Sequence, residues 1–524
     1  MSLPAINPTK TEAWKALEKH FQEIKTQQNE SFPSKDSGRA DRFKIEWQNF
    51  YLDYSKNRIT DKIISLLLEL AEQVKLKEAI SQQFSGKKIN ETEDRAVLHT
   101  ALRDFENMKP EVKATLQKMQ YFSEEVIRGA HKGFTGKAIT DIVNIGIGGS
   151  HLGPEMVTEA LQFYRNHLKT HFIANIDGDG VAEKLKDLNP ETTLFIIVSK
   201  SFTTQETIAN ASVVKDWFLK KGNDVDIHKH FVAVSANIDG AKDFGISQEN
   251  IFPMKDWVGG RFSLWSSVGL SICCSIGFNN FEAMLKGAFE MDKHFKNEDF
   301  DENIPVILAL ISIWYNNFFN TESEAVVAYS QYLNKLVPYL QQAVMESNGK
   351  SVDRNRQKID YQTGTIVWGN VGSNSQHAYF QLLHQGTKLI PTDFIGFSES
   401  LHGNVQNHNI LMANFFAQTE ALWEGTQNKN IDNPFKTFEG YKPTNTILIK
   451  KLTPNNLGSL IAMYEHKLFV QGIVWNIFSY DQWGVELGKT VAKETLQAIE
   501  NKDSSTICNA STKNLMRKFS NNEH

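Results

Sequence analysis

Residues 141–150 read DIVNIGIGGS, an apolar run that opens into glycines and a serine. An apolar run of this length, ended by glycines, is typical of a buried strand and a tight turn. Further apolar runs occupy 171–176, 194–201 and 230–236, and stretches with helical spacing separate them. Strands that alternate with helices in this way predict a parallel sheet covered by helices on both faces.

A second block of the same kind follows later in the chain. Its predicted strands are 322–330, 364–370 and 392–397, and its predicted helices are 336–345, 377–385 and 456–478. Each block contains a Gly/Ser-rich loop after a strand. We therefore expect an α/β protein with two three-layer α/β/α domains and parallel sheets, whose ligands bind at the carboxyl ends of the strands. The predicted divisions are an N-terminal helical segment (1–110), a smaller domain (111–285), a larger domain ending in a helical arm (286–510) and a tail (511–524).

Composition excludes several classes of protein. The 524 residues include 41% apolar and 22% charged residues, which is globular composition, and the net charge of −5 argues against nucleic acid as a partner. The three cysteines, Cys273, Cys274 and Cys508, fit a reducing compartment. The apolar run 304–315 is too short for a bilayer, which needs about 20 residues, and no signal peptide is expected. These features predict a cytoplasmic protein that does not associate with membranes.

The first glycine loop contains Gly148, Gly149 and Ser150. It does not match the dinucleotide fingerprint, because His151 stands where the last glycine is needed, which argues against a nicotinamide oxidoreductase. A tight turn whose backbone N–H groups face a ligand remains, and a purely structural turn is the open alternative.

The second candidate is SKSFTTQET, residues 199–207, directly after a predicted buried strand. A capping box over 203–206 predicts a helix start here. Free N–H groups at a helix start, flanked by hydroxyls and a lysine, suit one phosphate group, although an ordinary polar loop is the alternative. The candidate ligands are Ser199, Lys200, Ser201 and Thr204.

Five further residues are candidates on weaker grounds. Arg261 follows two glycines and could approach an anion, and Glu346 lies near the carboxyl end of a predicted helix as a candidate general base. His377 begins a predicted helix after the second Gly/Ser loop. If the chain is helical from 482, then Gln482 and Lys489 share one helix face with Glu486. Each is compatible with an ordinary surface role.

Together these motifs resemble the glucose-6-phosphate isomerase (phosphoglucose isomerase) family over about residues 40–500. The resemblance rests on NIGIGGSHLGP, SKSFTTQET, VGGRFSLWSSVG, MESNGK, GNVGSNSQHAYFQLLHQG and YDQWGVELGK. It implies two sugar-isomerase (SIS) domains, a homodimer with shared active sites, and a place in glycolysis and gluconeogenesis. The implied reaction is the reversible isomerisation of glucose 6-phosphate to fructose 6-phosphate through ring opening and an enediolate.

The resemblance also implies residue roles. Glu346 moves the proton between C2 and C1, and Arg261 stabilises the enediolate. His377, supplied by the neighbouring subunit, and Lys489 serve ring opening, while Gln482 contacts the sugar. The phosphate site is Ser199, Lys200, Ser201 and Thr204, and the sugar is bordered by Gly148, Gly149 and Ser150.

This chemistry needs no redox cofactor and in principle no metal, and the sequence shows no metal-ligand spacing. Two alternatives stay open. A non-catalytic sugar-phosphate sensor would keep residues 199–204 but need not keep Glu346, Arg261, Gln482 and Lys489 together, and the presence of all four favours the enzyme. A bifunctional glucose/mannose phosphate isomerase is harder to exclude, and Gln482 favours the glucose-specific form through the resemblance alone.

Overall fold

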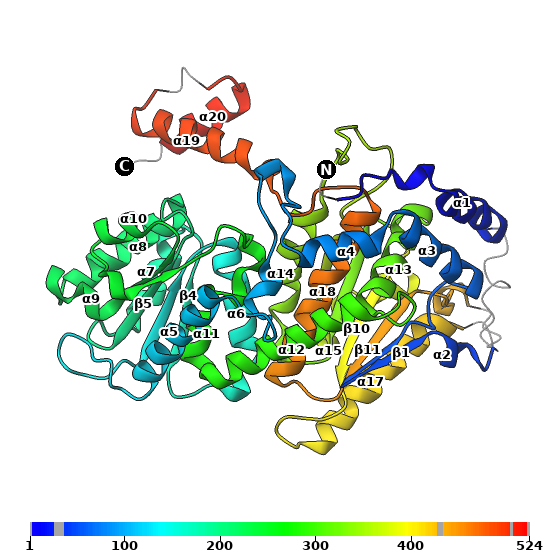
Figure 1. Ribbon diagram of the computed structural model, residues 1–524, viewed down its shortest axis with the longest axis horizontal. Coiled ribbons are helices and arrows are strands. Elements are labelled where there is room, and N and C mark those ends of the chain that lie inside the picture. Colours follow the sequence, from blue (N-terminus) through cyan, green and yellow to red (C-terminus); the bar gives the residue numbers. More distant parts are fainter. Residues whose placement is uncertain (1–2, 26–35, 427–432, 504–506, 521–524) are drawn as a thin grey trace. The chain divides into compact units, whose positions relative to one another are not determined.

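The computed structural model describes residues 3–25, 36–426, 433–503 and 507–520. The chain divides into two compact units, Met1–Ser479 and Tyr480–His524. The first unit contains both sheets (Figure 1). The second contains α19 (Glu486–Glu500) and α20 (Ala510–Ser520). The predicted boundaries near 110, 285 and 510 are not tested by this division and stay predictions.

The first sheet has five parallel strands in the order β4-β3-β5-β6-β7. Its strands are β3 (Asp141–Ile145), β4 (Lys169–Ile173), β5 (Thr193–Val198), β6 (Phe231–Ser235) and β7 (Ile251–Pro253). Its region contains the helices α5 (Pro110–Ile127), α6 (Leu152–Ala160), α7 (Gly178–Lys186), α8 (Gln205–Leu219), α9 (Ile227–His230), α10 (Ile238–Asp243) and α11 (Leu270–Ile276). The predicted strands are confirmed, and β7, only three residues long, was missed.

The second sheet has six strands in the order β1-β2-β11-β10-β8-β9. Its strands are β1 (Lys44–Trp47), β2 (Phe50–Asp53), β8 (Ser323–Ala328), β9 (Ile366–Val371), β10 (Thr392–Phe397) and β11 (Thr444–Ile449). The helices of this region are α12 (Phe278–Asn297), α13 (Ile304–Phe318), α14 (Leu336–Leu340), α15 (Gly372–Gln376), α16 (Phe380–Gln385), α17 (Val405–Glu424) and α18 (Pro454–Val474). The four strands β8 to β11 are parallel, as predicted, although β11 itself was not foreseen.

The N-terminal segment is not wholly helical. It contains α1 (Glu12–Lys25), α2 (Arg39–Arg42), α3 (Asp61–Gln73) and α4 (Leu76–Phe84), but β1 and β2 form a hairpin between α2 and α3. The hairpin extends the second sheet because β2 pairs with β11 in antiparallel register, with Leu52 opposite Ile447. Both strands have only four residues, and their side chains alternate between buried and more exposed positions. They were not predicted because the segment is rich in charged residues.

Helix α18 lies at the centre of the first unit, and almost all of its residues are buried. A helix buried on all sides must pair any charge that it carries. Its Glu465 accepts from Arg103 at 2.9 Å, and its Lys467 donates to Glu324 and, at 3.3 Å, to Asp393. His466 between them pairs through Nε2 with Asp292 Oδ1 at 2.7 Å. The three pairs explain how three successive polar residues, 465–467, occupy the middle of a predicted apolar helix.

Across the described ranges, no helix is both long enough and apolar enough to span a membrane.

The buried His294 of α12 predicts a loss of stability in acid. Its Nε2 accepts a hydrogen bond from the Ile304 N–H at 3.1 Å, and burial lowers its pKa from 6.5 to about 4. The unfolded chain therefore binds this proton near pH 6.5, whereas the folded chain resists it until about pH 4. The free energy of unfolding is therefore not reduced by this group above pH 6.5. It decreases as the pH falls toward 4, by up to about 3 kcal/mol.

We expect the midpoint of thermal unfolding to fall more steeply between pH 6.5 and 4.5 in the wild type than in His294→Gln, which keeps an acceptor but does not titrate. Differential scanning calorimetry over this range measures both slopes. Parallel curves would show that His294 is not a source of the acid sensitivity.

Candidate functional site

Three loops meet at the carboxyl ends of neighbouring strands in the first sheet. After β3, residues Gly148–Ser150 form a 3-10 turn, and after the adjacent β5 the chain runs through Ser199–Thr204 into α8. The third loop, the 3-10 segment Gly260–Trp265, passes directly against the first. A Cβ built on Gly149 would lie 2.0 Å from the Gly260 carbonyl oxygen, so only glycine permits this approach.

The loop before α8 has a constrained backbone. Phe202 adopts a left-handed conformation, with φ of 53°, and its buried ring packs against Phe244 at 5.9 Å. Non-glycine residues in this conformation cost of order 1 kcal/mol and cluster at functional sites. The Ser199 hydroxyl donates to the Thr204 hydroxyl at 3.1 Å. The loop thus gathers hydroxyls at the start of α8, where first-turn N–H groups lack intrahelical acceptors.

Two details of the prediction for this loop need correction. The helix starts where predicted, but the capping box is wrong: Thr204 is the N-cap, and its side chain makes no capping hydrogen bond. The Lys200 ammonium donates to the carbonyls of Asp256 and Val258, at 3.0 and 3.3 Å. Burial lowers the pKa of Lys200. Its two hydrogen bonds hold the neighbouring loop, residues 255–259.

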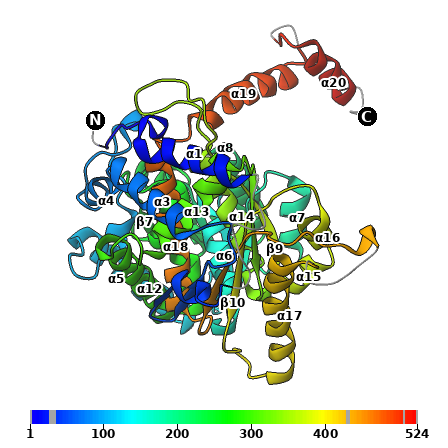
Figure 2. The same ribbon diagram turned by 90° about the vertical axis from the view of Figure 1, so that its right-hand side faces the viewer.

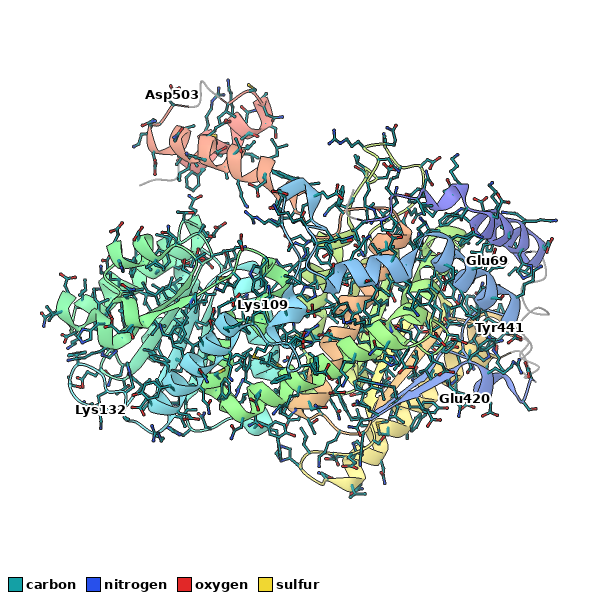
Figure 3. The ribbon with its side chains drawn as sticks, viewed as in Figure 1. Glu69, Lys109, Lys132, Glu420, Tyr441 and Asp503 are labelled. Carbon is teal, nitrogen blue, oxygen red and sulfur yellow. The ribbon has the colours of Figure 1, made fainter. Side chains whose placement is uncertain are left out.

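That neighbouring loop leads to Arg261. It is also held at Trp257, since the Lys109 ammonium lies over the Trp257 ring at 5.2 Å (Lys109 is labelled in Figure 3). Arg261 is almost completely buried, at 3% exposure. Its guanidinium donates from Nε to the Ser347 hydroxyl at 2.7 Å and from Nη2 to the Ser479 carbonyl at 2.6 Å.

Arg261 also contacts Glu346. Nη1 donates to Glu346 Oε2 at 3.2 Å, so the structure brings these two predicted site residues together. Glu346 ends a π-helical segment, Gln341–Glu346, that continues α14. Single π-helical turns are frequent at functional sites. The Glu346 side chain is 24% exposed, which leaves it reachable from solvent beside a buried cation.

Sequence reasoning missed one residue beside Glu346. The Gln342 amide donates to Glu346 Oε2 at 3.2 Å, and a Cβ built on Gly148 would lie 3.1 Å from Gln342 Nε2. Gln342 therefore links the carboxylate to the first glycine loop. Its position four residues before Glu346 on a predicted helix was the available signal.

The prediction that His377 begins a helix is wrong. It follows the last residue of α15, and a turn separates it from α16. The side chain is exposed. The preceding loop is fixed by Ser375, whose hydroxyl donates to the Val371 carbonyl and accepts from the Tyr379 hydroxyl, both at 2.8 Å. The backbone that presents His377 is therefore well defined, while its imidazole faces outward.

Gln482 and Lys489 belong to the second unit, which is described by itself. Gln482 precedes a 3-10 turn, Trp483–Val485, and α19 starts only at Glu486. The prediction that Gln482 shares a helix face with Glu486 and Lys489 is therefore wrong. The Lys489 ammonium donates to Glu486 Oε1 at 2.8 Å on an exposed face.

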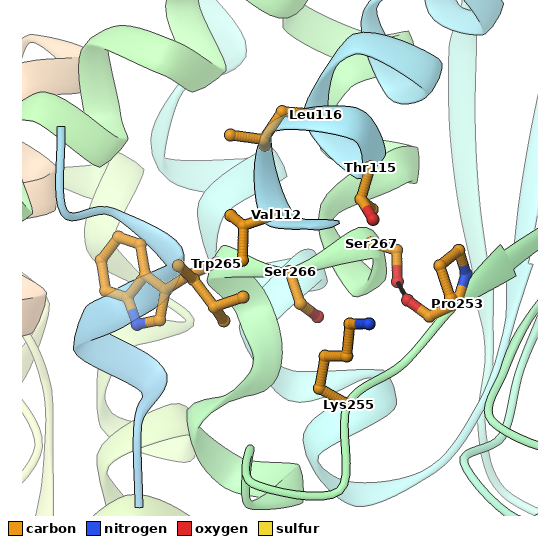
Figure 4. Close-up of a pocket in the computed structure, with 9 residues that line it drawn as sticks. Val112, Thr115, Leu116, Pro253, Lys255, Trp265, Ser266 and Ser267 are labelled. Atoms are coloured by element: carbon orange, nitrogen blue, oxygen red, sulfur yellow. Dashed lines mark hydrogen bonds between the residues drawn. The ribbon is translucent and has the colours of Figure 1, made fainter. Parts of the chain in front are cut away.

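A small cavity lies at the end of the 3-10 segment Gly260–Trp265, and Trp265 contributes to its wall (Figure 4). Its volume is about 20 Å³, and α5 contributes Val112, Thr115 and Leu116 to its wall. On the opposite side are Trp265 and Ser266, and the Ser267 hydroxyl donates to the Pro253 carbonyl at 2.7 Å. The cavity has room for one water molecule and is far too small for a sugar phosphate.

The chemistry available in the first unit is that of a carboxylate beside a fixed cation. Glu346 can accept and return a proton, and the Arg261 guanidinium keeps its charge at any physiological pH. Among the side chains that the structure describes, no group of three or more His, Cys, Asp or Glu residues could hold a metal ion. The arrangement suits proton transfer next to a developing oxyanion.

Comparison with known proteins identifies close relatives. The family model described as phosphoglucose isomerase matches residues 53–516. A glucose-6-phosphate isomerase of Christiangramia forsetii is 59% identical over 531 aligned positions, which cover 96% of this chain and 98% of the relative. The crystal structure of a glucose-6-phosphate isomerase from Chlamydia trachomatis superimposes with a TM-score of 0.88 at 31% identity, covering 98% and 99% of the two chains. A hypothetical protein from Thermus thermophilus shares the fold, with a TM-score of 0.66 at 22% identity over 85% of this chain and 99% of that one.

The contact between the two glycine-containing loops predicts a strong difference between two glycine substitutions. Gly149→Ala places a methyl group 2.0 Å from the Gly260 carbonyl oxygen, so backbone must shift, at a cost of about 1–3 kcal/mol. Gly260→Ala is the matched control, because its Cβ meets nothing within 4 Å.

We expect Gly149→Ala to lower the midpoint of denaturant-induced unfolding clearly, and Gly260→Ala to leave it within the small range of ordinary surface substitutions. Equal midpoints for the two variants would contradict the close approach of the loops.

Proposed function

Because the chain belongs to the phosphoglucose isomerase family, we propose that Glu346 is the base with which it performs the family's reaction. The enzyme is an isomerase that interconverts glucose 6-phosphate and fructose 6-phosphate, a step of glycolysis and gluconeogenesis. The observation that carries the proposed role is the contact between the Glu346 carboxylate and the buried Arg261 guanidinium. Glu346 removes the proton from C2 of the open-chain aldose and delivers it to C1, and the reverse reaction uses the same path.

Arg261 stabilises the enediolate in this proposal. When the proton passes to Glu346, negative charge moves onto the oxygens at C1 and C2 of the substrate. A guanidinium that is already fixed by three hydrogen bonds needs no reorganisation to interact with that charge. Gln342, whose amide holds the same carboxylate oxygen, helps to orient the base.

The substrate phosphate binds, we propose, at the start of α8. The ligands are the hydroxyls of Ser199, Ser201 and Thr204 and the N–H groups of the first helical turn, with the positive end of the helix dipole behind them. Lys200 adds charge from a short distance, since its ammonium is engaged with two carbonyls. Gly148, Gly149 and Ser150 border the sugar. Binding energy from the phosphate, which is remote from the reacting carbons, can orient C1 and C2 at the base.

The roles of Gln482 and Lys489 rest on the motif YDQWGVELGK within the matched family region. Gln482 contacts the sugar, and Lys489 assists ring opening on the ring-oxygen side.

We propose that the protein acts in the cytoplasm as a homodimer in which His377 enters the partner's site. His377 is exposed, and α15, α16 and α17 lie on one side of the first unit (Figure 2). The nearby exposed apolar side chains, Leu382, Ile410 and Phe416, are 42%, 58% and 49% exposed. Apolar groups on such a face favour burial against another protein surface, and a second copy of the chain would receive His377 there.

Glu346→Gln tests the proposed base. Gln keeps the size and the hydrogen-bonding capacity of the side chain but cannot take the proton. We expect turnover in a coupled assay of fructose 6-phosphate, run with added chelator, to fall about 10²–10⁴-fold, with little change in the affinity for the sugar phosphate. Near-normal turnover would remove Glu346 from the mechanism.

A mixed dimer tests the shared site. Glu346→Gln and His377→Ala subunits are unfolded together and reassembled. If His377 serves the partner's site, one site of each mixed dimer inherits both defects and the other inherits neither. With random pairing, half of the dimers are mixed, and activity should recover to roughly a quarter of that of the wild type.

If both residues serve the same chain's site, each site keeps one defect. Activity then stays at the level of the single variants, even where mass spectrometry shows that mixed dimers have formed.

A further inference from the structure

A chain of buried hydrogen bonds runs away from the proposed active site. The Ser479 hydroxyl donates to Asn348 Oδ1 at 2.7 Å, and Asn348 Nδ2 donates to Gln471 Oε1 at 3.2 Å. Gln471 Nε2 donates to the Ser312 hydroxyl at 2.9 Å, and that hydroxyl donates to Glu324 Oε2 at 3.1 Å. All five side chains are buried. We call this series the Ser479–Glu324 chain.

The direction of the chain is set at its far end. Glu324 is a carboxyl group paired with Lys467 on α18. Burial raises the pKa of Glu324, while the Lys467 ammonium favours the ionised form, which offers only acceptors. Ser312 must then point its hydrogen toward Glu324, Gln471 must point its amide N–H groups toward Ser312, and the same order continues to Ser479. Hydrogen bonds aligned in one direction polarise and strengthen one another in a buried environment.

The near end of the chain touches both proposed catalytic groups through the backbone. Asn348 follows Ser347 and lies two residues after Glu346, and its amide also donates to the Leu468 carbonyl at 3.0 Å. Ser479 supplies the carbonyl that receives Arg261 Nη2. The Asn348–Ser479 hydrogen bond therefore joins the segment that carries the base to the acceptor that holds the guanidinium.

Close packing shows that this junction is tightly built. A Cβ on Gly472 would lie 1.9 Å from the Ser479 hydroxyl oxygen and 3.4 Å from Asn348 Oδ1. The Arg354 guanidinium holds the same turn by donating to the carbonyls of Gly472, Ile473 and Ile477. Close packing therefore leaves the Ser479 hydroxyl little space to rotate toward a different acceptor.

We propose that Asn348, Gln471 and Ser479 are positioning residues for the isomerase reaction. Through the Ser479–Glu324 chain they hold the Glu346 carboxylate and the Arg261 guanidinium at their working separation. They touch neither substrate nor the transferred proton. The inference rests on the proposed role of Glu346 as the base.

The consequence for the reaction is a selective effect on the chemical step. Loss of one link lets the 346–348 segment and the Ser479 carbonyl move separately, which disturbs the alignment of base and cation. Proton transfer is sensitive to displacements well below 1 Å, whereas the phosphate site at α8 stands apart from this junction. The turnover number should fall while the KM for fructose 6-phosphate stays nearly constant.

Three serine-to-alanine substitutions test the proposal in the full-length enzyme. Ser479→Ala breaks the chain at its near end and Ser312→Ala at its far end. Ser459→Ala is the matched control: it also removes a buried hydroxyl, one that α18 directs at the Gly287 carbonyl at 2.8 Å, outside the chain. Initial rates are measured well below the unfolding temperature, per folded subunit as judged by circular dichroism, with Glu346→Gln as the reference.

We expect Ser479→Ala to lower kcat about tenfold with KM within about twofold of wild type. Ser312→Ala should lower kcat less but in the same direction, and Ser459→Ala should leave both constants unchanged. The double variant Ser312→Ala/Ser479→Ala should lose no more than Ser479→Ala alone, because a chain broken once no longer transmits. If Ser479→Ala fails to fold, the comparison of kcat between Ser312→Ala and Ser459→Ala tests the proposal.

Wild-type kcat in the folded chain variants, or a loss that Ser459→Ala shares, would overturn the positioning role. If Glu346→Gln remains active, the assignment of the base fails instead, and the two failures are separate results.

Discussion

A buried guanidinium must find acceptors for its N–H groups, since an unsatisfied buried charge costs several kcal/mol. Arg261 finds them in the Ser347 hydroxyl, the Glu346 carboxylate and the Ser479 carbonyl. These partners lie 85 to 218 positions further along the sequence. The requirement therefore ties the 3-10 segment Gly260–Trp265 to the π-helical segment and to the turn after α18. The geometry of the Glu346–Arg261 pair follows from the need to satisfy the N–H groups of one side chain.

The same principle extends into the core through α18. A central helix with no exposed face would normally be apolar, but this one carries Glu465 and Lys467 among its buried residues. Arg103 and Asp393 provide opposite charges at hydrogen-bonding distance. Removing one partner of such a pair leaves a buried charge, a larger penalty than the pair's net contribution to stability. The ion pairs thereby hold the helix in one orientation, and the turn that ends at Ser479 follows a fixed helix.

Several parts of the fold and site could be predicted because their signals are local. Buried parallel strands appear as short apolar runs, which identified β3, β5, β6 and β10. The loop before α8 was identified by hydroxyls after such a run. The β1–β2 hairpin was missed because each strand has four residues in a segment rich in charge, so pairing with β11 rather than composition decides its structure. Arg261 became a candidate because it follows two glycines, and its expected role came from the family resemblance rather than from periodicity.

The sequence by itself determined the two α/β blocks and their Gly/Ser loops, and it predicted the groups proposed for the reaction, because periodicity and short motifs act over a few residues. Only the tertiary structure decided that Arg261 contacts Glu346, that Gln342 shares the same carboxylate oxygen, and that His377 faces outward after α15. The physical reason is that hydrogen bonds and close backbone contacts join residues far apart in the chain. For example, the only local sign in the sequence that Gly149 approaches the Gly260 carbonyl is that residue 149 has no side chain.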